Sequence, residues 1–199
     1  MLDLCITSID EKIFDNIDSN SAMSLFATCS NLDVLNLNYF DTTKVTNMFS
    51  MFGNCNNLTK ILVTKFDTSN VIDMNSMFMS CNSLINLDLT HFNTSNVTNM
   101  YSMFLNCKKL ESLDLSSFDT SKVTDMENMF SGCVSLKELK LNNFSINNII
   151  DSNNMFNKCD SLNEITCSQE FKDWCIAHQA EINLPISMRE RGDGKWNII

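Results

Sequence analysis

The chain is 199 residues long, is 44% hydrophobic and carries a formal net charge of −10. A hydrophobic fraction of this size is typical of a folded globular protein and argues against intrinsic disorder. The acidic balance and the lack of a basic cluster exclude a typical nucleic-acid-binding protein, and they disfavour anionic membrane surfaces as partners. No run of about 18 apolar residues occurs, so we expect no insertion into a membrane.

The N-terminal segment, MLDLCITSIDEKIFDN, has early acidic residues and lacks the basic and apolar stretches of a secretory signal peptide. We therefore expect either a protein that is not secreted by that route or a fragment of a longer chain. Ile6 and Ile9 stand 26 residues before Leu32 and Leu35, at equivalent places in the repeat described next. Residues 1–13 are accordingly interpreted as a partial repeat at the N-terminal edge.

A 26-residue repeat fills residues 14–169 without insertions or deletions. The phenylalanine that opens each unit stands at Phe14, Phe40, Phe66, Phe92, Phe118 and Phe144. The six units therefore span 14–39, 40–65, 66–91, 92–117, 118–143 and 144–169. A unit this small cannot bury its apolar face alone, but stacked units share one continuous core. The period thus predicts a solenoid.

One unit, taken from residues 112–137, contains three kinds of local pattern. Leu113 and Leu115 alternate with polar residues, which predicts a short strand with one buried face. The following FDTSK is typical of a turn, and Val123 and Met126 then begin apolar spacing that predicts a short helical or 3-10 segment. The expected fold is an α/β repeat solenoid with one short parallel strand and one short helical segment per unit.

The consensus LxxLxLxxFdTSxVTxMxxMFxxCxxL resembles the leucine-rich repeat of BspA-type bacterial surface proteins, including the related mycoplasma lipoprotein repeats. This resemblance implies a right-handed coil with a non-enzymatic role in binding or adhesion, and it supplies no catalytic residues. Residues 170–199 resemble the segment that ends such arrays in gut-bacterial and phage-borne members. We expect a C-terminal cap there, with a helix near 169–181 that Ser168 caps, a turn and a short strand.

Six cysteines at the 26-residue step raise the question of metal or redox chemistry. A structural zinc site needs about four converging ligands, whereas each repeat supplies one thiol. Stacked identical side chains also point the same way, which suits a disulfide poorly. We expect instead a buried packing ladder, with zinc and disulfides as the alternatives. It comprises Cys29, Cys55, Cys81, Cys107, Cys133 and Cys159 with Phe52, Phe78, Phe104, Phe130 and Phe156.

Other candidate sites are weaker. Asp41, Asp67 and Asp119 recur after the opening phenylalanine, where turn capping is expected and calcium binding is the alternative. A bridge between Cys167 and Cys175 stays an open possibility.

The remaining chemistry-bearing residues form no catalytic pattern. His91 and His178 stand far apart in the sequence with no obvious partner, so we expect no enzyme and no cofactor. The RGD at 191–193 is the integrin-type tripeptide, but Gly and Asp there are also typical of a tight turn.

Outward positions of the predicted strands vary from unit to unit, whereas the inward positions do not. This variation is typical of a tailored contact surface, and drift of exposed residues is the simpler alternative. The predicted binding ribbon comprises Val34, Asn36, Lys60, Leu62, Asn86, Asp88, Ser112, Asp114, Glu138 and Lys140.

Together these patterns predict a non-enzymatic interaction or adhesion module of a bacterial-type surface protein. It would bind a host or envelope macromolecule, protein or glycan, through the exposed strands. The alternative is a structural or receptor-binding part of a phage virion, or an intracellular scaffold. A cell-surface or secreted location follows if the chain is part of a longer one, and a cytoplasmic or virion-associated location follows otherwise.

Overall fold

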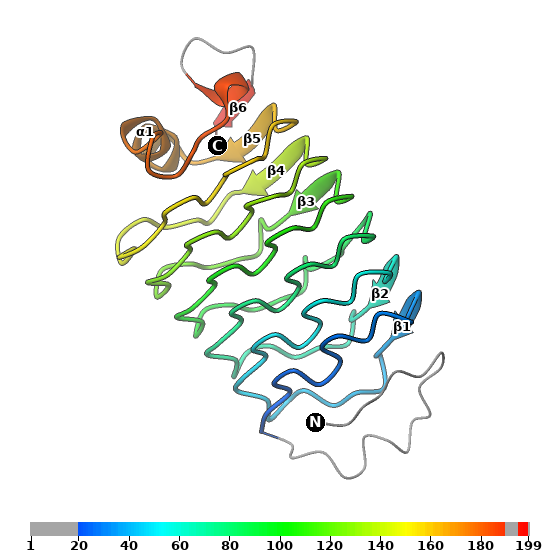
Figure 1. The fold of residues 1–199 in the computed structure, drawn as a ribbon. Helices are drawn as coiled ribbons and strands as arrows, with labels where there is room; N and C mark the ends of the chain where they lie inside the picture. Colours follow the sequence, from blue (N-terminus) through cyan, green and yellow to red (C-terminus); the bar gives the residue numbers. More distant parts are fainter. Residues whose placement is uncertain (1–19, 190–194, 199) are drawn as a thin grey trace.

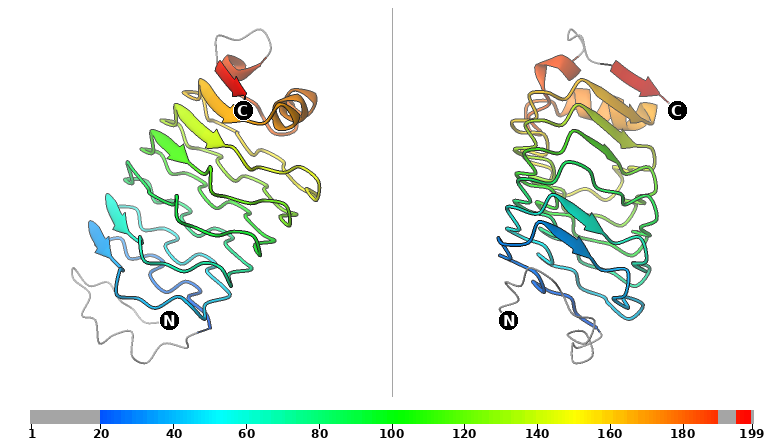
Figure 2. Two further views of the ribbon diagram at one scale, coloured as in Figure 1. Left: turned by 180° about the vertical axis from the view of Figure 1, so that it is seen from behind. Right: turned by 90° about the vertical axis from the view of Figure 1, so that its right-hand side faces the viewer.

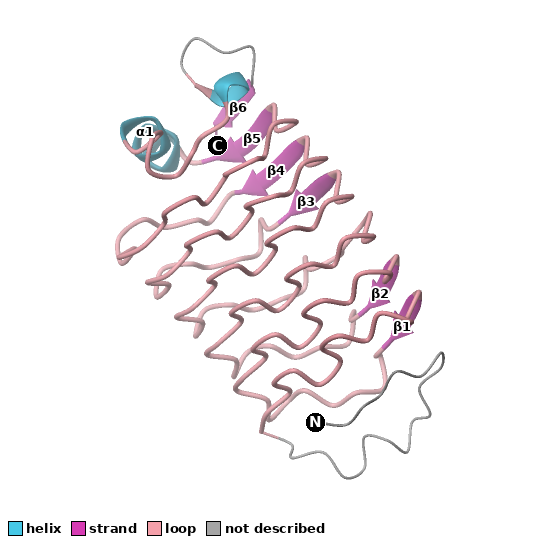
Figure 3. Ribbon diagram, viewed as in Figure 1, coloured by secondary structure: helices cyan, strands magenta, loops and turns pink. Residues whose placement is uncertain are grey.

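The computed structural model describes residues 20–189 and 195–198. Successive coils stack along one axis, with the strands on one side and irregular turns on the other (Figure 1, Figure 3). The helix α1 lies at the C-terminal end of the stack, and two further views show the same sidedness (Figure 2). The partial repeat predicted for residues 1–13 lies outside the described residues, as does the RGD triplet.

The strands are short and parallel, as the alternating leucines predict. The first sheet pairs β1 (Val34–Asn36) with β2 (Lys60–Leu62), and Leu35 lies opposite Ile61. The second sheet runs in the order β3 (Ser112–Asp114), β4 (Glu138–Leu141), β5 (Glu164–Cys167) and β6 (Lys195–Ile198). Repeat strands pair at the 26-residue step, for example Leu113 with Leu139, so their leucines all face one core.

The coil between β2 and β3 differs from its neighbours. Residues 84–89 carry the same LxxLxL pattern, yet they form no strand and pair with neither β2 nor β3. Leu84, Leu87 and Leu89 are nevertheless buried, so the coil keeps its place in the core. The apolar pattern therefore predicts burial correctly here and predicts the backbone pairing wrongly.

The segment expected to be helical is instead a chain of tight turns. Residues with positive φ recur four apart in it, as at Ser50 (φ 52) and Asn54 (φ 63). Such left-handed residues interrupt any α-helical run, and glycine and asparagine tolerate the conformation best of the residues found there. The same pairs occur at Ser24 and Thr28, Ser76 and Ser80, Ser102 and Asn106, Asn128 and Gly132, and Asn154 and Lys158.

Backbone hydrogen bonds tie each turn segment to the next coil. The N–H groups of Met48 and Phe52 donate to the carbonyls of Asp73 and Met77, both at 2.9 Å, whereas Met51 donates back to Met48. This alternation satisfies both the turn and the stack, which a helix with only internal bonds would not do. The turn side is therefore a second ladder, parallel to the strands.

The core consists of columns of identical side chains. Phenylalanine rings stack from coil to coil along one column, with Phe78 and Phe104 at a centroid distance of 5.7 Å and an interplanar angle of 2°. Methionine and cysteine from the turn side fill the space beside these rings, and all are buried. The column of rings comprises Phe26, Phe52, Phe78, Phe104, Phe130 and Phe156.

A buried threonine joins the coils at the corner that follows β1, β2 and β3. Thr68 Oγ1 donates to the carbonyl oxygen of Asn93 at 2.9 Å and accepts the N–H of the same residue at 2.8 Å. Thr42 and Thr120 make the same pair of bonds with the next coil. The T of FDTS is therefore an inter-coil tie, a role that its place in a predicted turn did not suggest.

The C-terminal segment covers the last coil with a helix and a strand. The helix α1 (Gln169–Ala177) begins after Ser168, whose Oγ accepts the N–H of Phe171 at 3.2 Å. Phe171 is buried and meets Phe144 edge-on at a centroid distance of 5.7 Å. After the 3-10 helix η2 (Ile186–Met188), β6 pairs with β5 and extends the sheet by one strand. In the described part of the chain, no helix is long and apolar enough to cross a membrane.

Candidate functional site

The outward side chains of the strands and of residues 84–89 lie on one side of the solenoid, which we call the strand face. It consists of the predicted ribbon, Val34, Asn36, Lys60, Leu62, Asn86, Asp88, Ser112, Asp114, Glu138 and Lys140, and of the equivalent residues of β5 and β6. Eight of those ten ribbon residues are exposed, and Leu62 and Asp114 are partly buried. The outward orientation predicted from the alternation is therefore found at every position.

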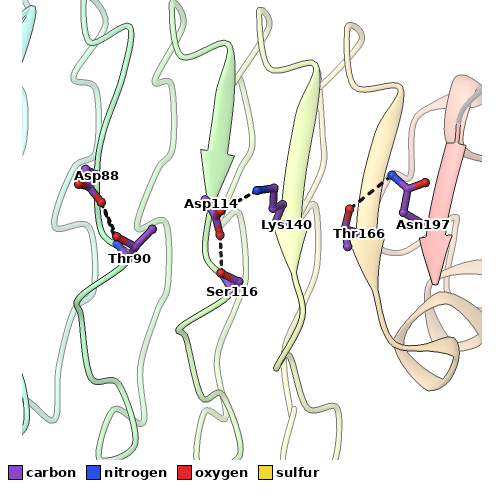
Figure 4. Close-up of polar contacts among 7 residues, drawn as sticks. All are labelled: Asp88, Thr90, Asp114, Ser116, Lys140, Thr166 and Asn197. Carbon is purple, nitrogen blue, oxygen red and sulfur yellow. Dashed lines mark hydrogen bonds and ion pairs between the residues drawn. The ribbon is translucent and has the colours of Figure 1, made fainter. Parts of the chain in front are cut away.

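One column of the strand face holds Asp88, Asp114 and Lys140 in three successive coils. Asp114 lies between two partners, because Lys140 Nζ approaches its Oδ2 at 2.9 Å and the Ser116 N–H donates to its Oδ1 at 3.0 Å (Figure 4). In the preceding coil, Asp88 accepts the N–H and the hydroxyl of Thr90 at 3.1 and 2.7 Å (Figure 4). The column therefore presents two adjacent carboxylates and one ammonium group to solvent.

These contacts keep both carboxylates ionised. Burial alone would raise the pKa of Asp114, but the hydrogen bonds from Lys140 and Ser116 outweigh it and the pKa is lowered. The hydrogen bonds from Thr90 lower the pKa of Asp88 in the same way. Both groups thus carry negative charge at neutral pH and can receive a cationic or hydrogen-bond-donating group.

A shallow hollow of about 140 Å³ opens on the strand face. Its lining residues are Ser112, Leu113, Asp114, Glu138 and Lys140. Four of the five belong to the predicted ribbon, and the buried Leu113 forms the floor. Polar walls of both charges around an apolar floor are suited to holding a side chain of a partner.

The sequence reasoning missed a further column of the same face, one residue before each strand. Lys137 Nζ pairs with Glu111 Oε2 of the adjacent coil at 3.1 Å. In the coil between β2 and β3, Ile85 holds the same position and is 45% exposed. The changing residue types at this earlier position were the available signal, since they vary as much as the ribbon does.

The cysteine ladder lies in the core and not on the strand face. From Cys55 to Cys159, the ladder thiols donate to a phenylalanine carbonyl of the preceding coil, for example Cys107 Sγ to Phe78 O at 3.2 Å and Cys133 Sγ to Phe104 O at 3.1 Å. Burial raises the pKa of Cys133 to about 12, so the thiol stays protonated and unreactive. Free buried thiols occur at Cys81, Cys107, Cys133, Cys159, Cys167 and Cys175. The possible bridge between Cys167 and Cys175 is therefore not formed.

The recurring aspartates of the turns cap their own backbone. Asp41 and Asp67 each accept the N–H two residues later, at 2.9 Å, and hydrogen bonds from Thr43 and Ser69 lower their pKa values. Within residues 20–189 and 195–198, no group of three or more His, Cys, Asp or Glu side chains is placed to hold a metal ion. The turn-capping interpretation accounts for the contacts that these aspartates make.

The two histidines serve local structure. His91 Nε2 lies 2.8 Å from the carbonyl oxygen of Val63 in the preceding coil, and the ring meets Phe92 edge-on. His178 Nδ1 lies 2.8 Å from the carbonyl oxygen of Trp174, and its ring stacks on that tryptophan. The positive charge of His91 also contributes to the lowered pKa of Asp88 on the strand face.

Comparisons with known proteins identify a family and a similar solved structure. A family model described as "Mycoplasma protein of unknown function, DUF285" matches residues 20–113 and 81–183. Among solved structures, the chain is similar to the leucine-rich repeat protein of T. pallidum, with 18% identity and a TM-score of 0.49. That similarity covers 72% of this chain and 60% of the other, so the chain spans less than two thirds of that protein. No curated protein matches the chain. The two family matches together cover most of the repeats, and the chain therefore belongs to the DUF285 family of BspA-like leucine-rich-repeat proteins.

Proposed function

We propose that the protein is a non-enzymatic interaction module that binds a macromolecular partner through its strand face. The observation that carries this proposal is the hollow between β3 and β4, which is lined by side chains that change from coil to coil. The core columns behind it are nearly invariant, so the scaffold holds constant while the outward residues differ. Repeat solenoids typically use such extended surfaces for binding.

We further propose that the partner is a host or cell-envelope protein or glycan, and that the module acts in adhesion at a bacterial surface. The support is the resemblance of the repeat to that of BspA-type surface proteins. The mixed charges of Asp88, Asp114, Glu138 and Lys140 favour a polar partner over a lipid surface.

A binding screen with matched variants tests the proposal. The protein is immobilised and exposed to mucin, extracellular-matrix proteins and bacterial envelope proteins and glycans, and surface plasmon resonance detects the ligand. Lys140→Glu removes the ion pair with Asp114 and adds a charge at the hollow. Lys44→Glu makes the same charge change at an exposed turn position off the strand face.

We expect Lys140→Glu to weaken binding of the captured ligand at least about tenfold, as loss of an interface charge contact does. Lys44→Glu should leave the affinity unchanged. Equal affinities for the wild type and both variants would show that the partner binds elsewhere and would refute the role of the strand face.

A further inference from the structure

Strand pairing along the strand face stops at residues 84–89, which form no backbone ladder with β2 or with β3. Where coils are paired, Leu37 donates its N–H to Leu62 O and Leu115 donates to Lys140 O, both at 2.9 Å. For residues 85–88, the structure gives no backbone hydrogen bond to either neighbouring coil. Both sides of this one coil therefore lack the bonds that join the other strands.

The turn side of the same coils is unbroken. Met74 donates its N–H to Asn99 O at 3.1 Å, and Phe78 donates to Met103 O at 2.9 Å. The column of stacked rings also continues through this level, with Phe78 and Phe104 at a centroid distance of 5.7 Å. Backbone hydrogen bonds thus join these coils along the turn side of the solenoid, whereas residues 85–88 on the strand side make none to the neighbouring coils.

The corner after each strand is tied as well, by side chains. His91 Nε2 lies 2.8 Å from Val63 O, and Ser117 Oγ donates to Leu89 O at 3.2 Å. The threonine tie between Thr68 and Asn93 is also intact at this level. The unpaired part is therefore limited to the strand segment itself, between two fixed flanks.

Charge on the outward side chains opposes pairing at this coil. Asp88 and Asp114 occupy the same column in adjacent coils, so two carboxylates stack where the next pair, Asp114 and Lys140, attract each other at 2.9 Å (Figure 4). Like charges directly opposite each other destabilise strand pairing. The missing backbone bonds and the repulsive pair thus coincide at the boundary between this coil and β3.

We propose that residues 84–89 form a hinge in the strand face. The part that carries β1 and β2 opens and closes against the part that carries β3 to β6, while the turn side acts as the fixed edge. The strand face then has an adjustable curvature and can adapt to the shape of a partner that spans both parts. The hinge is a property of the isolated protein and stands or falls independently of the proposed function.

Amide hydrogen exchange, followed residue by residue by NMR on the whole chain, tests the hinge. Residues 137–141 are the internal standard, because β4 is paired on both sides. We expect amides 85–89 to exchange at least about tenfold faster than that standard, since unpaired backbone opens at lower cost. Equal protection at 85–89 and 137–141 would overturn the proposal.

A substitution tests the cause. Asp88→Lys replaces the repulsive pair with an attractive one to Asp114, as Lys140 makes from the other side. We expect exchange at 85–89 to slow at least about threefold, in proportion to the gain in pairing. The control Asn36→Lys changes the same column in β1, which is already paired, and should leave exchange at Ile61 unchanged. An unchanged rate at 85–89 in Asp88→Lys would refute the charge as the cause of the opening.

Discussion

Cys107 donates its thiol proton to the carbonyl oxygen of Phe78, 3.2 Å away and one coil earlier. That same carbonyl also accepts the N–H of Cys81 at 3.2 Å, so both of its lone pairs are used. The cysteine column therefore does more than fill the core, because the thiols from Cys55 to Cys159 make buried hydrogen bonds between coils.

Replacing Cys107 with serine keeps the donor but removes the larger sulfur atom. Cys107→Ser should lower the free energy of unfolding by about 1–2 kcal/mol, because the shorter hydroxyl leaves a small gap in the core. Urea unfolding followed by circular dichroism measures the change. Cys107→Ala, which removes the donor too, should cost more, and an equal cost for both variants would show that the hydrogen bond contributes nothing.

The thiols of the core should not react with thiol reagents while the protein is folded. Burial raises the pKa of Cys133 to about 12 and those of Cys81, Cys107 and Cys159 well above the usual value, so almost no thiolate forms at pH 8. A thiol-specific chromogenic reagent should label these cysteines only after unfolding in urea. Rapid labelling of Cys133 in the native protein, located by mass spectrometry, would contradict the buried ladder.

The hydrogen bonds between Thr68 and Asn93 should stabilise the corner after β2, and a single substitution tests this. Thr68→Val keeps the shape of the side chain but removes both bonds to Asn93, leaving a buried N–H and carbonyl without that partner. The free energy of unfolding should fall by about 1–3 kcal/mol. Thr64→Val, four residues earlier, removes only a solvent-exposed hydrogen bond to Asn38 and should change it by less than about 0.5 kcal/mol. Similar losses for the two variants would argue against the tie.

Asp125 lies in the column of residues that form isolated bridges between the turn segments, and its charge makes the stability of the fold depend on pH. Burial, and secondarily the charge of Asp151, raise the pKa of Asp125 above the ordinary value of an aspartate. A raised pKa means that stability is complete when the carboxyl is protonated and falls as pH rises through the folded-state value. Asp125 therefore destabilises the fold at neutral pH.

Asp125→Asn should relieve this destabilisation. Asn47 and Asn99 fill the same column and accept the same N–H two residues later, so the turn is kept. Since Asp125 is partly exposed to solvent, the gain at pH 7 should be only about 0.5 kcal/mol, and it should vanish at acid pH. Chemical unfolding at pH 7 and pH 3 measures both values. A gain that persists at pH 3 would show that charge is not the cause.

Much of the fold could be predicted because every buried position is repeated. The step between Phe78 and Phe104 fixes the stacking of coils, and the alternation of Leu113 with its neighbours fixes which strand residues face outward. A single period thus determines the register, the core and the exposed face together.

The turn side and the hinge could not be predicted in the same way. Apolar spacing of three residues is common to a helix and to a chain of turns, and only the left-handed residues such as Asn54, Asn106 and Gly132 distinguish them. Asparagine and glycine at those positions were the available signal. Residues 84–89 keep the leucines of a strand, so the loss of pairing has no counterpart in the apolar pattern. The hollow depends on the rotamers of Glu138 and Lys140, which the sequence does not determine.

Both ladders of the solenoid link a residue to its counterpart about one repeat later, through the strands on one side and the turns on the other. An insertion of one residue would put the two ladders out of step with each other, whereas removal or addition of 26 residues would leave both in step. The molecule can therefore change its reach only in whole coils of about 4.8 Å each. Its length can therefore take only a fixed series of values, and recombination between repeats, which adds or removes whole coils, is the genetic event that changes it.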